Sequence, residues 1–283
     1  MKIIVIAITL MAVNLNCQAR QVCCPAKIAC MEAEKTPISA AAEILKPDDT
    51  STLKGVLEKL RKRTSTLTNL EANIEYLFIE DPAMMDSRTL QKGKFYFQKE
   101  KKRSRIRINF DKRKQDDEDE YTSIQQIIFD GVWLIRIDHE LKTIVYDQQT
   151  EKDKPIEAFE FISRNFPMIG FTKTEELETN FDIKMLENNN DPNTPIHLRL
   201  KPKPKSKYAK EYSRLNFWID KKSFLPSRLV TTEFADVEGE GNIYDIKLKK
   251  IKANKKIEKA VFKVETPAGF TEDRRVLEDK RKK

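Results

Sequence analysis

Short segments in which apolar and polar residues alternate make up the C-terminal third of this chain, and they limit the fold more than any other feature. Apolar residues recur at every second position in 196–200 and 215–219, and a similar alternation continues in 243–248 and 260–264. A strand with this pattern has one apolar face, which is buried, and one polar face, which is exposed to solvent. Turn-forming residues such as Asp220-Lys221-Lys222-Ser223 separate the runs. We therefore predict a mainly β, α+β protein with an antiparallel sheet that is apolar on one side.

The N-terminus has the layout of a cleaved secretory signal. Lys2 supplies a positive charge, residues 3–13 are an apolar core too short to span a bilayer, and the small residue Ala19 ends the segment. A buried N-terminal helix is the alternative interpretation. We expect export to the periplasm, a signal peptide over residues 1–19, a flexible segment over 20–48 and one domain over 49–283.

All four cysteines precede residue 31. They lack the C-x-x-C spacing of a zinc site, and the chain has only two histidines to complete one. Cleavage after Ala19 would leave Cys23, Cys24 and Cys30, an odd number that does not suit a disulfide framework. We expect no metal, and the role of these three thiols stays open. A lipid-modified Cys17 is not expected, because Asn16 rather than a small residue precedes it.

The charge distribution and the absence of known motifs argue against several classes of function. The formal net charge is +8, yet basic and acidic residues alternate along most of the 283 residues and no nucleic-acid-binding signature occurs. The acidic run 116–120 has no glycine and is interpreted as a solvated loop rather than a calcium site. Asp130, Asp138 and His139 are the candidates for an enzyme, but they fall at predicted turns and no hydrolase, P-loop or dinucleotide motif is present. We expect no enzyme activity, no cofactor and no nucleic-acid partner.

The domain itself begins with a helix near Ser51, whose apolar residues recur with helical spacing. Alternation then predicts strands over 72–78, 93–97 and 105–110. Asp130-Gly131 between two apolar runs predicts a tight hairpin.

One segment breaks the strand pattern. Residues 155–171 begin with Pro155 and carry aromatic and aliphatic side chains with no strict period. We interpret them as a short apolar helix and loop inserted into the sheet protein. The segment either fills the core or forms a mobile lid over an apolar pocket, and both alternatives predict burial.

Several short pieces over about residues 52–271 together resemble the LolA-type outer-membrane lipoprotein carriers and their lipoprotein-sorting relatives. The pieces, in chain order, are Leu67–Ala72, Phe129-Asp130-Gly131-Val132-Trp133, Leu198-Arg199-Leu200-Lys201-Pro202, Phe217-Trp218-Ile219-Asp220, Glu240-Gly241-Asn242, Ile246, Leu248, Asn254, Phe262, Pro267 and Gly269. The resemblance implies an unclosed, curved antiparallel half-barrel with helices packed in its concave face. It also implies a monomeric periplasmic carrier that shields lipoprotein acyl chains, or other lipids, between an inner-membrane donor and an outer-membrane acceptor protein. The alternative on the same fold is a lipid-binding sensor or envelope-stress regulatory module.

The same resemblance, together with the apolar pattern, selects the candidate site. The predicted lipid cavity consists of Phe95, Phe97, Ile106, Ile108, Phe110, Ile135, Ile137, Phe159, Phe161, Ile162, Phe166, Met168, Ile169, Phe171, Leu215, Phe217 and Ile219. Lys102 or Arg103 occupies the turn where the family carries an arginine that ties the lid shut, although the proline of that turn is missing here. Lysine lacks the planar fork of arginine, so a gate at Lys102 would be weaker or shifted. The alternative is a solvated basic turn without a gating role.

Overall fold

A computed structural model describes residues 50–81, 87–100, 103–158, 161, 174–187, 191–235 and 240–277 of the chain. All of these belong to one compact unit, Lys46–Lys283. The predicted signal peptide and the segment 20–48 lie outside the described residues. The elements are α1 (Leu53–Ser65), β1 (Asn69–Ile79), β2 (Arg88–Lys99), β3 (Ser104–Gln115), β4 (Tyr121–Phe129), β5 (Trp133–Asp138), β6 (Thr143–Gln148), α3 (Thr174–Asn180), β7 (Phe181–Glu187), β8 (Ile196–Pro202), β9 (Tyr212–Ile219), β10 (Pro226–Phe234), β11 (Glu240–Ala253), a 3-10 turn η1 (Lys259–Phe262) and β12 (Thr271–Arg275).

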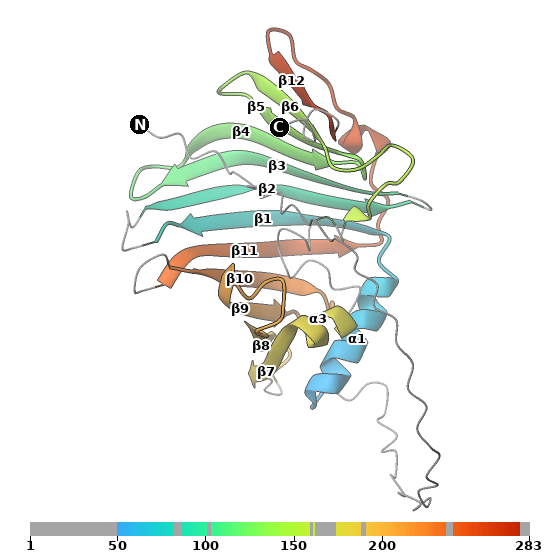
Figure 1. Ribbon diagram of the computed structural model, residues 1–283, viewed down its shortest axis with the longest axis vertical. Helices are drawn as coiled ribbons and strands as arrows, with labels where there is room; N and C mark the ends of the chain where they lie inside the picture. Colours follow the sequence, from blue (N-terminus) through green and yellow to red (C-terminus); the bar gives the residue numbers. More distant parts are fainter. Residues whose placement is uncertain are drawn as a thin grey trace, which may run out of the picture. The chain divides into compact units, whose positions relative to one another are not determined.

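The strands form a single twelve-stranded sheet in the order β12-β6-β5-β4-β3-β2-β1-β11-β10-β9-β8-β7. Neighbours are antiparallel except β12, which runs parallel to β6. Figure 1 shows β12 and β7 at opposite ends of a curved sheet. Because no hydrogen bonds join these two end strands, the sheet does not close into a barrel. The predicted unclosed half-barrel is therefore confirmed.

β-Bulges interrupt the pairing of the central strands. Register shifts occur between Lys92 and Gly93 on β2 and between Phe110 and Lys112 on β3, and bulges increase the local twist of a strand pair. A Cβ atom on Gly93 would lie 1.9 Å from the carbonyl oxygen of Asn109. Only glycine therefore allows the two backbones to approach so closely at this point.

The pairing registers separate the side chains onto two faces. The inner face carries Phe97, Ile106 and Phe129, which are direct partners across β2, β3 and β4. The outer face carries Arg107 and Ile128, which are partners one position away. Burial along β1 alternates over most of its length, as the alternation in the sequence predicts.

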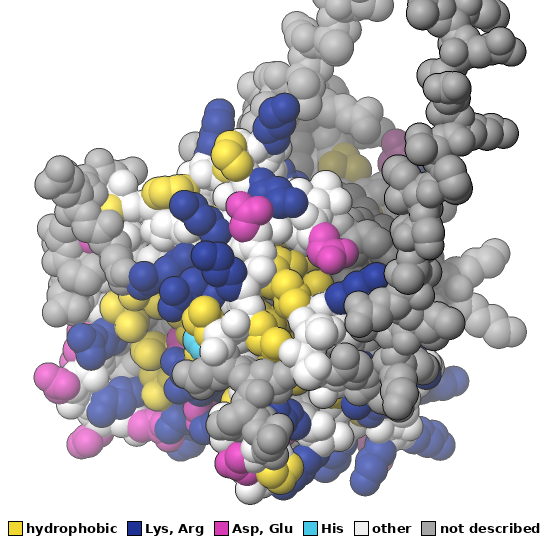
Figure 2. Space-filling model, turned by 90° about the horizontal axis from the view of Figure 1, so that it is seen from below, with side chains coloured by type: hydrophobic (Ala, Val, Ile, Leu, Met, Phe, Trp, Pro, Cys, Tyr) yellow, Lys and Arg dark blue, Asp and Glu magenta, His cyan; other side chains and the backbone are white. Residues whose placement is uncertain are grey.

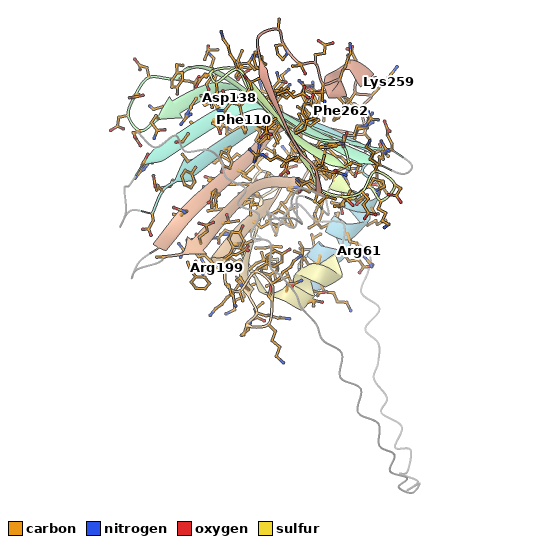
Figure 3. All side chains as sticks on the ribbon, turned by 45° about the horizontal axis from the view of Figure 1, so that its top comes forward. Arg61, Phe110, Asp138, Arg199, Lys259 and Phe262 are labelled. Carbon is orange, nitrogen blue, oxygen red and sulfur yellow. The ribbon has the colours of Figure 1, made fainter. Side chains whose placement is uncertain are left out.

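Helix α1 covers part of the inner face. Thr52 caps its N-terminus by accepting a hydrogen bond from the Gly55 N–H at 3.2 Å, and the predicted stripe buries Val56 and Leu60 completely. The Arg63 Nε atom donates to the Ser223 carbonyl, 3.0 Å away in the β9–β10 turn. Figures 1 and 3 show α1 and α3 side by side on the concave side of the strands.

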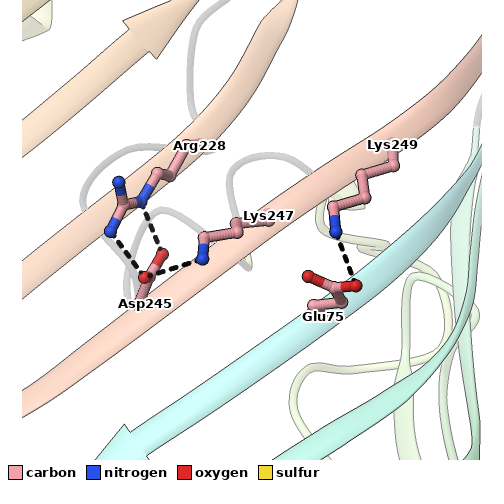
Figure 4. Close-up of polar contacts among 5 residues, drawn as sticks. All are labelled: Glu75, Arg228, Asp245, Lys247 and Lys249. Atoms are coloured by element: carbon pink, nitrogen blue, oxygen red, sulfur yellow. Dashed lines mark hydrogen bonds and ion pairs between the residues drawn. The ribbon is translucent and has the colours of Figure 1, made fainter.

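Ion pairs lie on the outer face of the central strands. Arg228 holds Asp245 with two bonds of 2.9 and 2.7 Å, and Lys249 reaches Glu75 at 2.6 Å (Figure 4). Lys and Arg side chains also gather on the molecule as seen from its β7 edge (Figure 2). Asp245 is only 6% exposed, so its two bonds to Arg228 compensate for lost hydration, whereas more exposed pairs such as Lys249–Glu75 contribute little stability each.

The C-terminal segment corrects one prediction. Residues 260–264 were expected to form a strand, but η1 occupies Lys259–Phe262, labelled at both ends in Figure 3. Instead, β12 pairs with β6, and this strand was not predicted. Val264 and Phe270 pack on the outer face against a buried cluster of Ile128, Ile135, Ile137 and Ile144. Val264 and Phe270 thus cover an apolar patch of the outer face.

Arg107 attaches this segment to the sheet. Its guanidinium donates to the carbonyl oxygens of Val261 and Lys263, both at 2.8 Å, and to Asn109 Oδ1 and Gln126 Oε1, both at 2.7 Å. Partial burial lowers the pKa of Arg107, and these four acceptors compensate for the lost hydration.

Replacing Arg107 by Met should lower the free energy of unfolding by about 1–3 kcal/mol, because carbonyl groups of the C-terminal segment lose their donors. Arg105→Met is the matched control, since Arg105 pairs with Glu100 only at the surface. Its effect should stay within about 0.5 kcal/mol. Urea denaturation of both variants measures the difference, and equal destabilisation would show that Arg107 does not hold the segment.

Candidate functional site: the inner face of the half-barrel

Most predicted cavity residues that the structure describes meet on the inner face. The pairs Phe95–Ile108 and Phe97–Ile106 connect β2 with β3, and Phe110 follows on β3. The strands beyond β11 continue the same surface, because Tyr76, Ile246, Leu229 and Phe217 follow one another across β1, β11, β10 and β9. The inner-face residues from the prediction are Phe95, Phe97, Ile106, Ile108, Phe110, Leu215, Phe217 and Ile219. All of them are buried except Ile108, which is half-buried.

The apolar inserted segment enters this face. Ala158 and Phe161 are helical, and the Phe161 N–H bonds the Glu157 carbonyl at 2.8 Å. Ser104 Oγ accepts from the Ala158 N–H at 2.5 Å, and the Phe161 ring stacks on Phe129 with centroids 4.0 Å apart. The predicted residues Phe159, Ile162, Phe166, Met168, Ile169 and Phe171 lie outside the described part of the chain.

Two predicted cavity residues belong elsewhere. Ile135 pairs with Ile128, and Ile137 follows two positions later on β5, so both lie on the outer face. They pack beneath the C-terminal segment rather than beside Ile106. The sequence prediction failed here because β5 is apolar on both faces, with Leu134 and Ile135 both buried. Its sequence therefore does not show which side chains point to the inner face.

Only one of the two gate candidates can be placed. Arg103 is exposed in the β2–β3 turn, where its carbonyl accepts from the Glu100 N–H at 2.6 Å. Lys102 lies outside the described residues. The position of Arg103 is that of a solvated turn residue.

A polar band crosses the inner face, and the sequence analysis did not identify it. On β2 to β5, Gln91 Nε2 donates to Gln125 Oε1 at 2.8 Å, and Gln125 Nε2 donates to Asp138 Oδ2 at 3.0 Å. Arg113 is the cross-strand partner of Gln91. Figure 3 labels Asp138 and the neighbouring apolar residue Phe110. A signal was present in the sequence, because these residues are polar side chains at inward positions of otherwise apolar strands.

The band continues through three tyrosines on the other half of the sheet. The Tyr76 and Tyr244 rings lie 6.4 Å apart, and the Tyr244 hydroxyl hydrogen-bonds the Glu233 carboxylate. Burial is the main cause that raises the pKa of Tyr76, Tyr212 and Tyr244, and Glu233 adds to each shift. Burial also raises the pKa of Glu211. The inner face is therefore amphipathic, with an apolar area that extends toward α1 and a polar band across the strands.

The enzyme candidates have turn roles in the structure. Asp130 Oδ1 accepts from the N–H groups of Val132 and Trp133, and Asp138 Oδ1 accepts from those of Glu140 and Leu141. The His139 ring lies on the outer face against Phe270, with ring centroids 5.2 Å apart. Within the described ranges, no group of three or more His, Cys, Asp or Glu side chains is placed to hold a metal ion.

The outer face also holds a pocket, of about 470 Å³, between the sheet and the segment 260–267. Its lining mixes Arg107, Gln126 and His139 with Ile137 and Val261. The arginine in it is already bonded to four acceptors.

Among the helices that the structure describes, none is long and apolar enough to cross a membrane.

Comparisons with known proteins yield likenesses in structure. No family model matches the chain. No curated protein matches it. An uncharacterised conserved protein from Thermus thermophilus is 12% identical, with a TM-score of 0.45, and the alignment covers 78% of this chain and 98% of that one.

Two further solved structures are similar at the same low level. A putative outer membrane lipoprotein-sorting protein domain from Vibrio parahaemolyticus is 11% identical, with a TM-score of 0.34 and coverage of 73% of this chain and 94% of that chain. A LolA superfamily protein from Nitrosomonas europaea is 13% identical, with a TM-score of 0.30 and coverage of 75% and 98%.

The three tyrosines of the polar band should resist ionisation while the protein is folded. The folded pKa values of Tyr76, Tyr212 and Tyr244 lie above the unfolded value of about 10, so above that pH the unfolded chain binds fewer protons and stability falls. Near-ultraviolet tyrosinate absorbance should show at least three of the seven tyrosines ionising only as the protein unfolds. Ionisation of all seven in a protein that is still folded by circular dichroism would contradict the assigned burial.

Proposed function

We propose that this protein is a non-enzymatic carrier that binds the acyl chains of lipoproteins or related lipids on the inner face of its half-barrel. The observation that carries the proposal is the amphipathic inner face of an unclosed sheet. A sheet that closes tightly fills its interior with side chains, whereas an open one covered by helices leaves its apolar face accessible when the cover moves.

Burial of hydrocarbon supplies the binding energy. Each methylene moved from water to an apolar surface contributes about 0.8 kcal/mol, so a single acyl chain can be held without covalent chemistry. Ile108 and Ile127 are cross-strand partners on the inner face and are both only half-buried. They are therefore suited to contact a chain that enters beside Phe161.

Export completes the proposal. Residues 1–19 have the layout of a secretory signal, which would deliver the mature protein to the periplasm. There the carrier would take a lipid from an inner-membrane donor and release it to an outer-membrane acceptor. Phe161 and the segment around it would form the part of the cover that opens, and its stacked ring on Phe129 is the contact that opening would break.

A matched pair of variants on β4 tests acyl binding. Ile127→Asp places a charge on the inner face, whereas Ile124→Asp places the same charge at a position that is 40% exposed. A fluorescent fatty-acyl probe should bind the Ile127→Asp variant more than about tenfold more weakly, because desolvating an unpaired charge costs several kcal/mol. The Ile124→Asp variant should bind as the parent does.

Thermal melts must accompany this measurement, because unfolding would imitate lost affinity. If both folded variants lose the probe equally, or if the parent binds no probe, the inner face is only a packed core. Either result would remove the carrier proposal.

A further inference from the structure

Among the residues that the structure describes, buried polar groups on three neighbouring strands of the inner face, β2 to β4, lack hydrogen-bond partners. Gln91 and Ser123 are 2% and 1% exposed, and their Oε1 and Oγ atoms make no hydrogen bond there. The Nε atom of Arg113 is also buried and makes none with the described residues. Buried polar atoms are normally paired, so such groups indicate a function or a missing partner.

These groups lie close together. Gln91, Arg113 and Ser123 are on the consecutive strands β2, β3 and β4, and Gln91 is paired directly with Arg113. Ser123 lies in the register shift between β3 and β4. Neighbouring strands are about 4.8 Å apart, so the three side chains span roughly 10 Å, which one small polar group and its substituent can bridge.

The hydrogen-bonding character of each group is fixed. The Asp138 carboxylate only accepts, so the Gln125 amide turns its NH₂ toward Asp138 and its oxygen toward Gln91. Gln91 then donates its NH₂ to Gln125, which leaves Gln91 Oε1 as an acceptor. Arg113 Nε is a charged donor, and the Ser123 hydroxyl can donate as well.

A ligand that satisfies this set must combine anionic oxygens with a hydrogen-bond donor. Resting on the carrier function proposed above, we infer that the site takes the head group of a glycerophospholipid whose phosphodiester is linked to a donor, such as glycerol or ethanolamine. The phosphodiester oxygens accept from Arg113 and Ser123, and the hydroxyl or ammonium donates to Gln91. The acyl chains extend from this group over Phe110 and Ile108 toward α1.

Other amphiphiles would leave at least one of the three groups, on Gln91, Arg113 and Ser123, without a hydrogen-bond partner. A fatty-acid carboxylate serves Arg113 and Ser123 but brings no donor to Gln91. Phosphocholine has the same deficiency, because its quaternary nitrogen carries no hydrogen. A neutral diacylglycerol offers no anion to Arg113. The site therefore predicts selectivity among lipids with identical chains.

The test uses the full mature protein and short-chain lipids below their aggregation limits, with binding measured by displacement of the acyl probe. Phosphatidylglycerol and phosphatidylethanolamine should bind about tenfold more tightly than phosphatidylcholine or a fatty acid of equal chain length. Gln91→Leu should abolish that preference. Arg113→Met should weaken phosphatidylglycerol binding at least about tenfold and leave diacylglycerol binding unchanged.

Lys112→Met is the matched control, because Lys112 is the exposed neighbour of Arg113 and lies near Thr122 on the outer face. It should leave the lipid preference unchanged. Equal binding of all lipids would overturn the head-group assignment while the carrier function stands. Equal losses from Lys112→Met and Arg113→Met would overturn it too. If no amphiphile displaces the probe, or the probe itself does not bind, the carrier function and this inference fail together.

Discussion

An antiparallel sheet that does not close must cover its apolar face with something other than its own strands, and this requirement organises the whole molecule. On one side α1 and the segment at Ala158 and Phe161 supply the cover. On the other side, the C-terminal segment covers the small apolar patch around Ile128, and Arg107 holds it there. Elsewhere the outer face carries ion pairs such as Lys249–Glu75. A cover made of separate segments can move without breaking the sheet, which is what reversible binding needs.

The polar band makes the two ends of the inner face chemically different. An entirely apolar surface would hold a hydrocarbon chain in any orientation, whereas a band of hydrogen-bonding groups fixes which end of an amphiphile lies where. Gln91 and Tyr76 mark its centre, on adjacent strands. Buried polar groups cost stability when they are left unpaired, and the proposed head-group recognition rests on the Gln91 Oε1 and Ser123 Oγ atoms of this band, which are unpaired among the described residues.

The sequence predicted the sheet well because alternation reports directly on which face of a strand is buried. It predicted the hairpin at Asp130 for a similar reason, since the Asp-Gly turn has its own local chemistry. It misplaced Ile135 and Ile137, because β5 is buried on both faces and pairing decides the side. It also missed Arg113, because only the pairing register places this residue opposite Gln91 on the inner face.

The central claim is that acyl chains lie on the inner face, and the two native tryptophans make a direct measurement possible. Trp133 packs on the outer face, and Trp218 stacks there on His197, with ring centroids 4.3 Å apart. A lipid with brominated acyl chains should therefore leave the tryptophan fluorescence of the parent protein unquenched. An Ile108→Trp variant adds an indole to the inner face, and the same lipid should quench that added emission. Quenching of the parent, or none in the folded variant that binds the lipid, would contradict the account.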